Sequence, residues 1–312
     1  MTGSNHFAQV WAPVVALSLD RALGDPPNRW HPVAWQGRLL DLASRHAPDG
    51  DRARFFYGGA VVLLGAGLSA AAGAAVEGLA ARLPPAPGLL LRGAALKLAI
   101  ACHGLDRAAC EVEDALRRED LPAARRLLGW HLVSRPTGDL SATEVAGAAV
   151  ESVAENLTDA FVAPICVWAV GGLSALWAYR FCQTADSMWG YHDREHEWLG
   201  KPAARADDVL NWLPARLATA LLACAGALQG ADVRGGIRAR AAQASRTASP
   251  NAGQTMATMA GLLHVTLTKR GHYSLAGGTA AATPDTIRQA RKIVRSAAWL
   301  GGLLVSTVKA LA

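Results

Sequence analysis

The apolar segment Phe55–Ala81 constrains the fold more than any other part of the chain. Its 27 residues include one charged side chain, that of Glu77. A helix needs roughly 20 consecutive apolar residues to cross the hydrocarbon core of a bilayer, and the many Gly and Ala residues of this segment suit close packing between helices. The segment therefore predicts a transmembrane helix.

Two further segments are candidate spans. Ala160–Phe181 and Val209–Gly230 each carry one charged residue, Arg180 and Arg216 respectively. We expect Gly171-Gly172 to break the first of them. Phe7–Leu19 is short for a span but could enter the membrane as a helix, and Leu89–Leu105 predicts an amphipathic or partly buried helix. Ala252–Leu267 is uncharged but mixed, and Ser296–Ala312 is apolar.

The polar segments predict loops and soluble helices. Leu23–Val33 holds three prolines and a glycine, which forbid a continuous helix. Asp106–Leu128 is charged and periodic and predicts a helical hairpin, and Thr143–Glu155 predicts a helix capped by Ser141 or Thr143. No segment shows the sustained alternation of a strand. We therefore expect an all-α, polytopic integral membrane protein, with residues 1–312 in one membrane-embedded domain and a polar helical insertion at approximately 106–140.

Composition excludes several classes of protein. Charged residues make up 18% of the chain, against about 25% in ordinary soluble domains. The net charge is +6 without a dense Lys/Arg block, which argues against a nucleic-acid partner. None of the five cysteines forms a CxxC pair, so we expect reduced thiols. Arginine-rich loops lie on both sides of the candidate spans and leave the orientation in the membrane open.

The densest set of acids begins at Glu151. Glu151, Glu155 and Asp159 are spaced four residues apart, so one helical face would carry all three. Such a face repels itself, and Mg²⁺, which prefers carboxylate oxygens and bridges substrate phosphates, would relieve the repulsion. The alternative interpretation is a solvated acidic face.

Three more polar sets border the apolar segments. The first contains Asp186 and Tyr191. The second contains Arg205, Asp207, Asp208, Asn211 and Arg216. Arg216 lies inside an apolar segment, where an ionisable group is costly enough to be a functional candidate. The alternative interpretation is that Arg216 pairs with Asp208 only for packing. The third contains Arg246, Ser249 and Asn251. Ser249 or Asn251 would cap the following helix, whose N-terminus suits an anion.

Two short motifs carry little weight. His192-Asp-Arg-Glu-His196 matches an inverted zinc-protease pattern, but it has no obvious third ligand. Gly65-Ala-Gly-Leu-Ser-Ala70 resembles a dinucleotide-binding loop, but it lies inside the best span and follows no strand. The chain has no P-loop motif.

Taken in order, the motifs resemble those of the adenosylcobinamide-phosphate synthases, the CobD/CbiB family of cobalamin biosynthesis. They run from residue 24 to about residue 261, so the resemblance covers most of the chain. The matching stretches are Gly24-Asp-Pro26 with His31-Pro-Val33, Ala148 to Asn156 with Asp159 and Ala163-Pro164, Asp186-Ser-Met188 with Gly190-Tyr191, Ala203 to Asp208 with Asn211 and Pro214-Ala-Arg216, and Ser249 to Gly253 with Met259-Ala-Gly261.

The resemblance implies an activity and its reactants. A polytopic protein of the inner membrane would join a corrinoid propionate, as adenosylcobyric acid, to aminopropanol phosphate through an amide bond, using ATP and magnesium. Association with itself or with other membrane enzymes of the pathway stays open. The residues that would carry this chemistry are Glu151, Glu155 and Asp159, or Asp207 and Asp208, for magnesium and ATP; Arg135, Arg205, Arg216 and Arg246 for phosphates; and His31, Asn156, Asp186, Tyr191, Asn211 and Asn251 for orienting substrate.

The chain departs from the family pattern at several positions. Ser134-Arg-Pro-Thr137 stands where the family usually has Gly-Arg-Asp-Thr, so Pro136 removes both an acid and a backbone N–H donor. Ala160 replaces a frequent Gly and Gln183 a usual Asn. These changes would shift the preference for the amino-alcohol phosphate rather than abolish the chemistry.

Two functions of other classes stay open. A magnesium-dependent membrane transferase acting on a prenyl or lipid diphosphate would also place acids at helix ends, although the chain lacks D-D-x-x-D and N-D-x-x-D motifs. A non-catalytic corrinoid-binding membrane protein would share the fold without turnover.

Overall fold

The computed structural model describes residues 3–191 and 193–311. Its chain divides into two compact units, each with its own packing. Unit 1 comprises Met1–Ala101, Ala163–Asn211 and Gly302–Ala312, and unit 2 comprises Cys102–Val162 and Trp212–Gly301. Whether both units belong to one functional domain stays a prediction.

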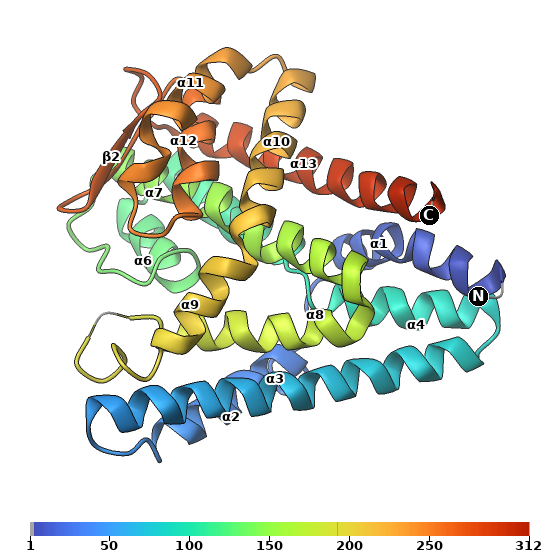
Figure 1. The fold of residues 1–312 in the computed structure, drawn as a ribbon. Helices are drawn as coiled ribbons and strands as arrows, with labels where there is room; N and C mark the ends of the chain where they lie inside the picture. Colours follow the sequence, from blue (N-terminus) through green and yellow to red (C-terminus); the bar gives the residue numbers. More distant parts are fainter. Residues whose placement is uncertain (1–2, 192, 312) are drawn as a thin grey trace. The chain divides into compact units, whose positions relative to one another are not determined.

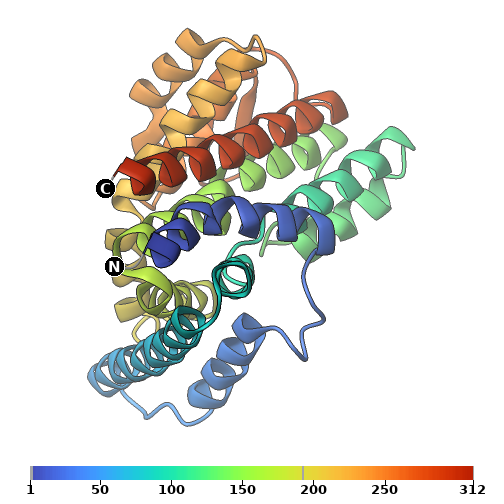
Figure 2. The same cartoon turned by 90° about the vertical axis from the view of Figure 1, so that its right-hand side faces the viewer.

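Unit 1 is helical. Its elements are α1 (Gly3–Leu23), α2 (Pro32–Ser44), α3 (Asp51–Arg82), α4 (Pro85–Lys97), α8 (Ala163–Trp189) and α9 (Lys201–Leu210). The long helix α3 packs along α8, and α1 packs along α4 (Figure 1). Helix α2 contacts α3 and α8, and Figure 2 shows it at the lower edge of the view next to α3.

Small residues allow these helices to approach closely. A Cβ atom at Gly73 of α3 would lie 2.4 Å from the Leu173 carbonyl oxygen of α8, and one at Gly93 of α4 would lie 2.4 Å from Val15 of α1. These contacts explain why the apolar helices are rich in glycine.

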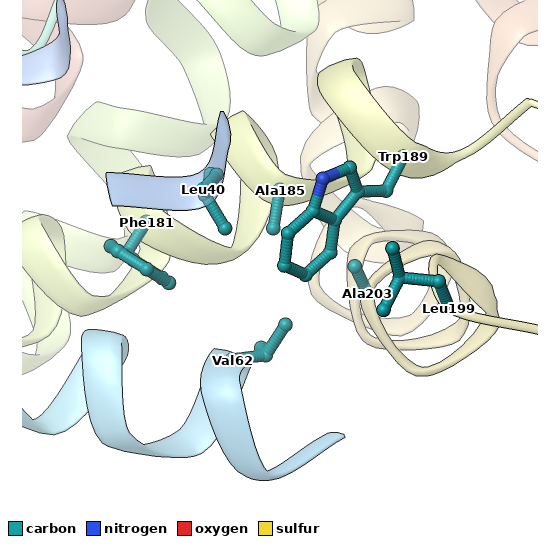
Figure 3. Close-up of a cluster of buried hydrophobic side chains, with 7 residues drawn as sticks. All are labelled: Leu40, Val62, Phe181, Ala185, Trp189, Leu199 and Ala203. Carbon is teal, nitrogen blue, oxygen red and sulfur yellow. The ribbon is translucent and has the colours of Figure 1, made fainter. Parts of the chain in front are cut away.

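A cluster of buried apolar side chains joins α2, α3, α8 and α9. Figure 3 shows its members, which are Leu40, Val62, Phe181, Ala185, Trp189, Leu199 and Ala203. The Trp189 side chain is 1% exposed, and it is the largest fully buried side chain in the described structure. Its burial fixes the end of α8, shortly before the predicted site residue Tyr191.

Unit 2 combines helices with one small hairpin. Its elements are α5 (Cys102–Arg117), α6 (Leu121–His131), α7 (Ala142–Leu157), the π-helical turn η1 (Thr158–Val162), α10 (Trp212–Leu228), α11 (Val233–Gln243), the 3-10 turn η2 (Ala244–Arg246), α12 (Ala252–Leu262), β1 (Thr266–Lys269) and β2 (Tyr273–Ala276). The last helix, α13 (Pro284–Leu311), belongs to unit 2 up to Gly301.

Helix α7 is the core of unit 2, because every residue from Val145 to Ala154 is buried. Ser141 begins the helix as predicted. Its hydroxyl accepts from the Glu144 backbone N–H while the Glu144 carboxylate accepts from the Ser141 backbone, which is a capping box. Helices α5, α6 and α12 and strand β1 pack against α7.

The structure confirms an all-α architecture with membrane-spanning character. Two helical segments, Asp51–Arg82 and Ala142–Trp189, are long and apolar enough to cross a membrane. The number rises to four if α4 with α5, and α9 with α10, each form one broken span. The predicted break in α8 is present, since Gly172 has φ 64° and ψ −159°.

One predicted helix was wrong in its bounds, and one small hairpin was not predicted. Leu89–Leu105 is not one helix, because α4 ends at Lys97 and the turn that follows buries Ala99 and Ile100. Helix α12 stops at Leu262, before His264 adopts φ 55°, a conformation that cannot continue a helix. The hairpin β1–β2 after it was not predicted, because each strand has only four residues.

Candidate functional site

An acid–base cluster lies on α7 in unit 2. Glu151 and Glu155 are one turn apart on this helix. The Glu151 side chain is 6% exposed, and its Oε2 accepts a hydrogen bond from Nη2 of Arg135 at 3.3 Å. Glu155 is exposed, although the ten residues before it are buried. The cluster therefore reaches from the core of unit 2 to its surface.

Two polar atoms of the Glu151–Arg135 pair lack partners. Glu151 Oε1 and Arg135 Nε are both buried, and neither forms a hydrogen bond within the described chain. Leaving a buried donor or acceptor unsatisfied costs about 1–3 kcal/mol, and more for a charged group. The pair offers one acceptor and one donor to a bound polar ligand.

The loop between α6 and α7 positions Arg135. Arg125 Nε donates to the Leu140 carbonyl at 2.7 Å, and the Thr137 hydroxyl donates to the Arg125 carbonyl at 2.8 Å. Pro136 is exposed in this loop. The loop is thus held by hydrogen bonds that do not involve Pro136.

The β1–β2 hairpin adds two residues that the sequence reasoning missed. Lys269 and Tyr273 are direct partners in the antiparallel register, and both interact electrostatically with Glu151. Burial, together with the charges of Glu151 and Glu155, raises the pKa of the Tyr273 hydroxyl well above its ordinary value, so the hydroxyl stays a donor. The turn at Gly271 (φ 73°) was the available sequence signal.

Arginines with neutral partners form a second feature of unit 2. Arg216 donates to the carbonyl of Trp212 at 2.7 Å and to Asn251 Oδ1 at 2.9 Å, and its guanidinium lies 4.4 Å from the centre of the Trp212 ring. Arg240, which was not predicted, donates to Gln254 Oε1 at 2.9 Å and repels Arg216. The expected packing pair between Arg216 and an acid is absent from the described ion pairs.

The segment before α12 differs from the expected cap. Asn251 occupies the N-cap position of α12, as predicted, but its side chain makes no capping hydrogen bond. The hydroxyl of Thr247 accepts from the Gly253 backbone N–H at 3.1 Å. Asn251 instead accepts from Arg216, as described above. Arg246 is exposed and donates to the Ser274 carbonyl at 3.3 Å.

A polar cluster at α8 and α9 belongs to unit 1. Asn211 Nδ2 donates to Asp207 Oδ2 at 2.9 Å, and the Tyr179 hydroxyl donates to Asn211 Oδ1 at 2.9 Å. Asp186 and Asp208 repel each other electrostatically. Among the predicted residues, Asn211 is thus bonded to Asp207 and Asp186 lies within electrostatic range of Asp208, whereas Arg205 and Tyr191 are exposed.

The loop before α2 forms a third polar group, also in unit 1. His31 Nδ1 accepts from the Val33 backbone N–H at 3.2 Å, so the ring proton sits on Nε2, which faces Asp25 Oδ1 at 3.7 Å. Lys97 donates to the same oxygen at 2.6 Å. Burial alone would raise the pKa of Asp25, but hydrogen bonds from His31 and Lys97 outweigh it and hold the pKa at about 2.

The remaining predicted residues are placed as follows. Asn156 donates back to the Ser152 carbonyl of its own helix at 2.9 Å. Asp159 lies in the π-helical turn η1 rather than in α7, so the three-acid face is not one continuous α-helix. His192 of the zinc-like motif lies outside the described residues, and His196 contacts Asp193 at 2.9 Å. Across the described chain, no three His, Cys, Asp or Glu side chains gather closely enough to hold a metal.

Comparisons with known proteins match the chain to one protein family. The sequence model of a family described as "CobD/Cbib protein" matches residues 13–299. The cobalamin biosynthesis protein CobD of Dehalococcoides mccartyi is 36% identical over 285 residues, covering 91% of this chain and 92% of the relative. CobD of Chromobacterium violaceum is 40% identical, covering 81% and 79%, and CbiB of Salmonella choleraesuis is 37% identical, covering 83% and 82%. No solved structure matches the chain.

Proposed function

Because the chain belongs to the CobD/CbiB family of cobalamin biosynthesis, we propose that it is an adenosylcobinamide-phosphate synthase of the inner membrane. It joins the carboxylate of adenosylcobyric acid to the amine of an amino-alcohol phosphate in an ATP-dependent reaction. The observation that supports this most is the buried Glu151–Arg135 pair, whose unsatisfied acceptor and donor suit a substrate carrying both charges.

Amide formation needs activation of the acid. In the proposed reaction a carboxylate oxygen of the corrinoid attacks the γ-phosphorus of ATP, which gives an acyl phosphate and releases ADP. The amine nitrogen then attacks the acyl carbon, the C–N bond forms, and the C–O bond to phosphate breaks. The ammonium group of the acceptor loses one proton before the attack and a second after it, so the site needs an acceptor for protons.

Glu151 is the best-placed proton acceptor in unit 2. Its Oε1 has no donor within the described chain, and its Oε2 is held by Arg135. Glu155, one turn further and exposed at the surface, passes protons outward. Asn156, whose amide nitrogen donates to the Ser152 carbonyl, stays a candidate for orienting substrate.

Magnesium and ATP fit the residues that are present. Mg²⁺ is commonly bound by one or two carboxylates together with substrate phosphates, so the lack of a three-residue group does not oppose it. Arg135 and Lys269 already balance the charges of Glu151 and Glu155. The carboxylates that would hold the metal are Glu151, Glu155 and Asp159, or alternatively Asp207 and Asp208, and both assignments stay predictions. The ion would neutralise charge on the transferred phosphoryl group.

The arginines of unit 2 suit the phosphates of ATP. Arg216 and Arg240 repel each other and use neutral oxygens as partners, so neither charge is cancelled by a carboxylate in the contacts described above. A polyphosphate would relieve that repulsion.

The reaction itself tests the proposal. Protein purified in detergent is supplied with adenosylcobyric acid, aminopropanol phosphate, ATP and magnesium, and the condensed corrinoid is sought by mass spectrometry. We expect product only when all four are present. Product without ATP, or turnover of a prenyl diphosphate but not of the corrinoid, would overturn the proposal, and corrinoid binding without any turnover would indicate a non-catalytic binding protein.

A further inference from the structure

The hairpin β1–β2 and helix α7 together form a binding site for a zwitterionic aminoalkyl phosphate, we propose, with Lys269 and Arg135 on its phosphate and Glu151 on its ammonium group. This inference rests on the function proposed above and assigns the acceptor substrate to named residues. Lys269 and Tyr273 are the new members of the site.

The register of the hairpin directs both new residues towards α7. Directly opposed residues of an antiparallel pair share one face, and so do residues two apart along a strand. Leu267 pairs with Leu275, and both are fully buried. Lys269 and Tyr273 form the next pair on the same face. The inner face of the hairpin therefore ends in a lysine and a phenol.

Helix α7 presents the matching residues at helical spacing. A Cβ atom at Gly147 would lie 3.9 Å from Leu267, so this glycine faces the hairpin. Glu151 and Glu155 follow Gly147 by four and eight residues and continue the same face. Leu267 thus packs at Gly147, and the polar end of the hairpin interacts with the two glutamates.

An ion pair holds the hairpin to the start of α7. Arg270, in the turn, donates from two nitrogens to the two oxygens of Glu144. Glu144 is also the partner of Ser141 in the capping box. Because bidentate pairs restrict geometry as well as distance, this contact positions the residue next to it, Lys269.

The charges of the cluster select the kind of ligand. Two glutamates face two cations, Arg135 and Lys269, and the Tyr273 hydroxyl stays neutral. A ligand with separated positive and negative groups can pair with both signs without leaving a buried charge uncompensated. ATP carries no positive group, and the Arg216–Arg240 pair suits it better.

The unsatisfied atoms show where such a ligand would bind. Glu151 Oε1 is a buried acceptor that suits an ammonium donor, and Arg135 Nε is a buried donor that suits a phosphate oxygen. Only 6% of the Glu151 side chain is exposed, so water does not compete strongly with a ligand for this carboxylate.

Two ligands that differ in one group test the assignment. Ethanolamine phosphate carries both charges, whereas 2-hydroxyethyl phosphate lacks the ammonium group. Their binding to the full-length protein in detergent is measured by calorimetry without ATP. The variants are Lys269→Met and Glu151→Gln, and Lys292→Met, at an exposed lysine of α13, is the matched control.

The expected pattern separates the two roles. Lys269→Met weakens both ligands about tenfold or more, since each loses a charge-assisted contact to phosphate. Glu151→Gln weakens ethanolamine phosphate by a similar factor and leaves 2-hydroxyethyl phosphate within about twofold. Lys292→Met leaves both unchanged. Equal binding of both ligands to the wild type, or no loss on Lys269→Met, would overturn the assignment.

Kinetics distinguish failure of this inference from failure of the proposed function. If the wild type makes the condensed corrinoid but Lys269→Met raises the KM for ATP and not that for the amino-alcohol phosphate, the synthase activity stands and the site assignment is wrong. If the wild type makes no product with any amine, the proposed function fails, whereas the calorimetric pattern would still show a zwitterion site.

Discussion

The ammonium nitrogen of Lys97 lies 2.6 Å from Oδ1 of Asp25, which is 72 residues earlier in the chain. The Lys97 side chain is 6% exposed and that of Asp25 is 34% exposed. This contact ties the proline-rich loop before α2 to the end of α4. It also places a charged lysine in the interior of unit 1, where its partner decides whether it is tolerated.

The first prediction is a loss of stability in acid. The pKa of Asp25 is about 2 in the folded protein, against 3.8 for the unperturbed group. A depressed pKa contributes stability that is complete above pH 3.8 and is lost as the pH falls towards 2. After allowance for partial exposure we expect about 1–2 kcal/mol. Urea unfolding in detergent between pH 5 and pH 2 measures this loss in the free energy of unfolding. Asp25→Asn should make the free energy of unfolding less dependent on pH in this range. An equally steep dependence in the variant would show that Asp25 is not its source.

The second prediction concerns the Lys97–Asp25 pair as a unit. Replacing Lys97 by Met leaves Asp25 beside an apolar side chain and should lower the free energy of unfolding by about 2 kcal/mol, less than for a fully buried pair. The double variant Lys97→Met with Asp25→Asn should recover much of that loss. The double-mutant cycle at pH 7 gives the coupling free energy directly. Additive effects would show that the two side chains do not interact.

The third prediction tests the close packing of α3. A Cβ atom at Gly58 would lie 2.0 Å from the Leu199 carbonyl oxygen, whereas one at Gly67 of the same helix meets nothing within 4 Å. Gly58→Ala should therefore destabilise by about 1–3 kcal/mol, and Gly67→Ala should be neutral or stabilising. The two denaturation midpoints are compared in the same detergent. Equal midpoints would mean that Leu199 does not approach α3 in this way.

The fourth prediction concerns Arg216. Its guanidinium contacts Asn251, the Pro250 carbonyl and the Trp212 ring together, which a lysine cannot reproduce. Arg216→Lys should lower kcat/KM for ATP about tenfold to a hundredfold, or about 1.4–2.8 kcal/mol. Arg238→Lys, at a side chain that is 79% exposed, is the control. A normal kcat/KM in Arg216→Lys would restrict Arg216 to a packing role.

Much of the fold follows from local patterns in the sequence. Phe55–Ala81 predicted most of α3, Ser141 predicted the start of α7, and Gly171-Gly172 predicted the break in α8. These features depend on a run of apolar residues, a hydroxyl at a helix start and a glycine conformation. Each of these signals determines the structure of the same segment in which it occurs.

The missed features depend on contacts between distant residues. Lys269 and Tyr273 reach the glutamates of α7 through the register of strands too short to show alternation. The Lys97–Asp25 contact is set by the packing of α4 in unit 1. Asn251 stands at the predicted N-cap position of α12, but its side-chain oxygen accepts from Arg216, and the Thr247 hydroxyl accepts from the Gly253 N–H. The spacing of acids did place Glu151 and Glu155 on one helix, whereas the one local signal for their cationic partner Lys269 was the nearby Gly271, which indicates a turn but no contact with α7.

Isotope transfer tests the central claim most directly. Adenosylcobyric acid labelled with ¹⁸O in both carboxylate oxygens is incubated with the protein, magnesium, ATP and aminopropanol phosphate. The account predicts an amide product that keeps one ¹⁸O and inorganic phosphate that gains the other, because the oxygen that attacks the γ-phosphorus leaves with it. Label in AMP, unlabelled phosphate beside a normal yield of product, or no product at all would contradict it.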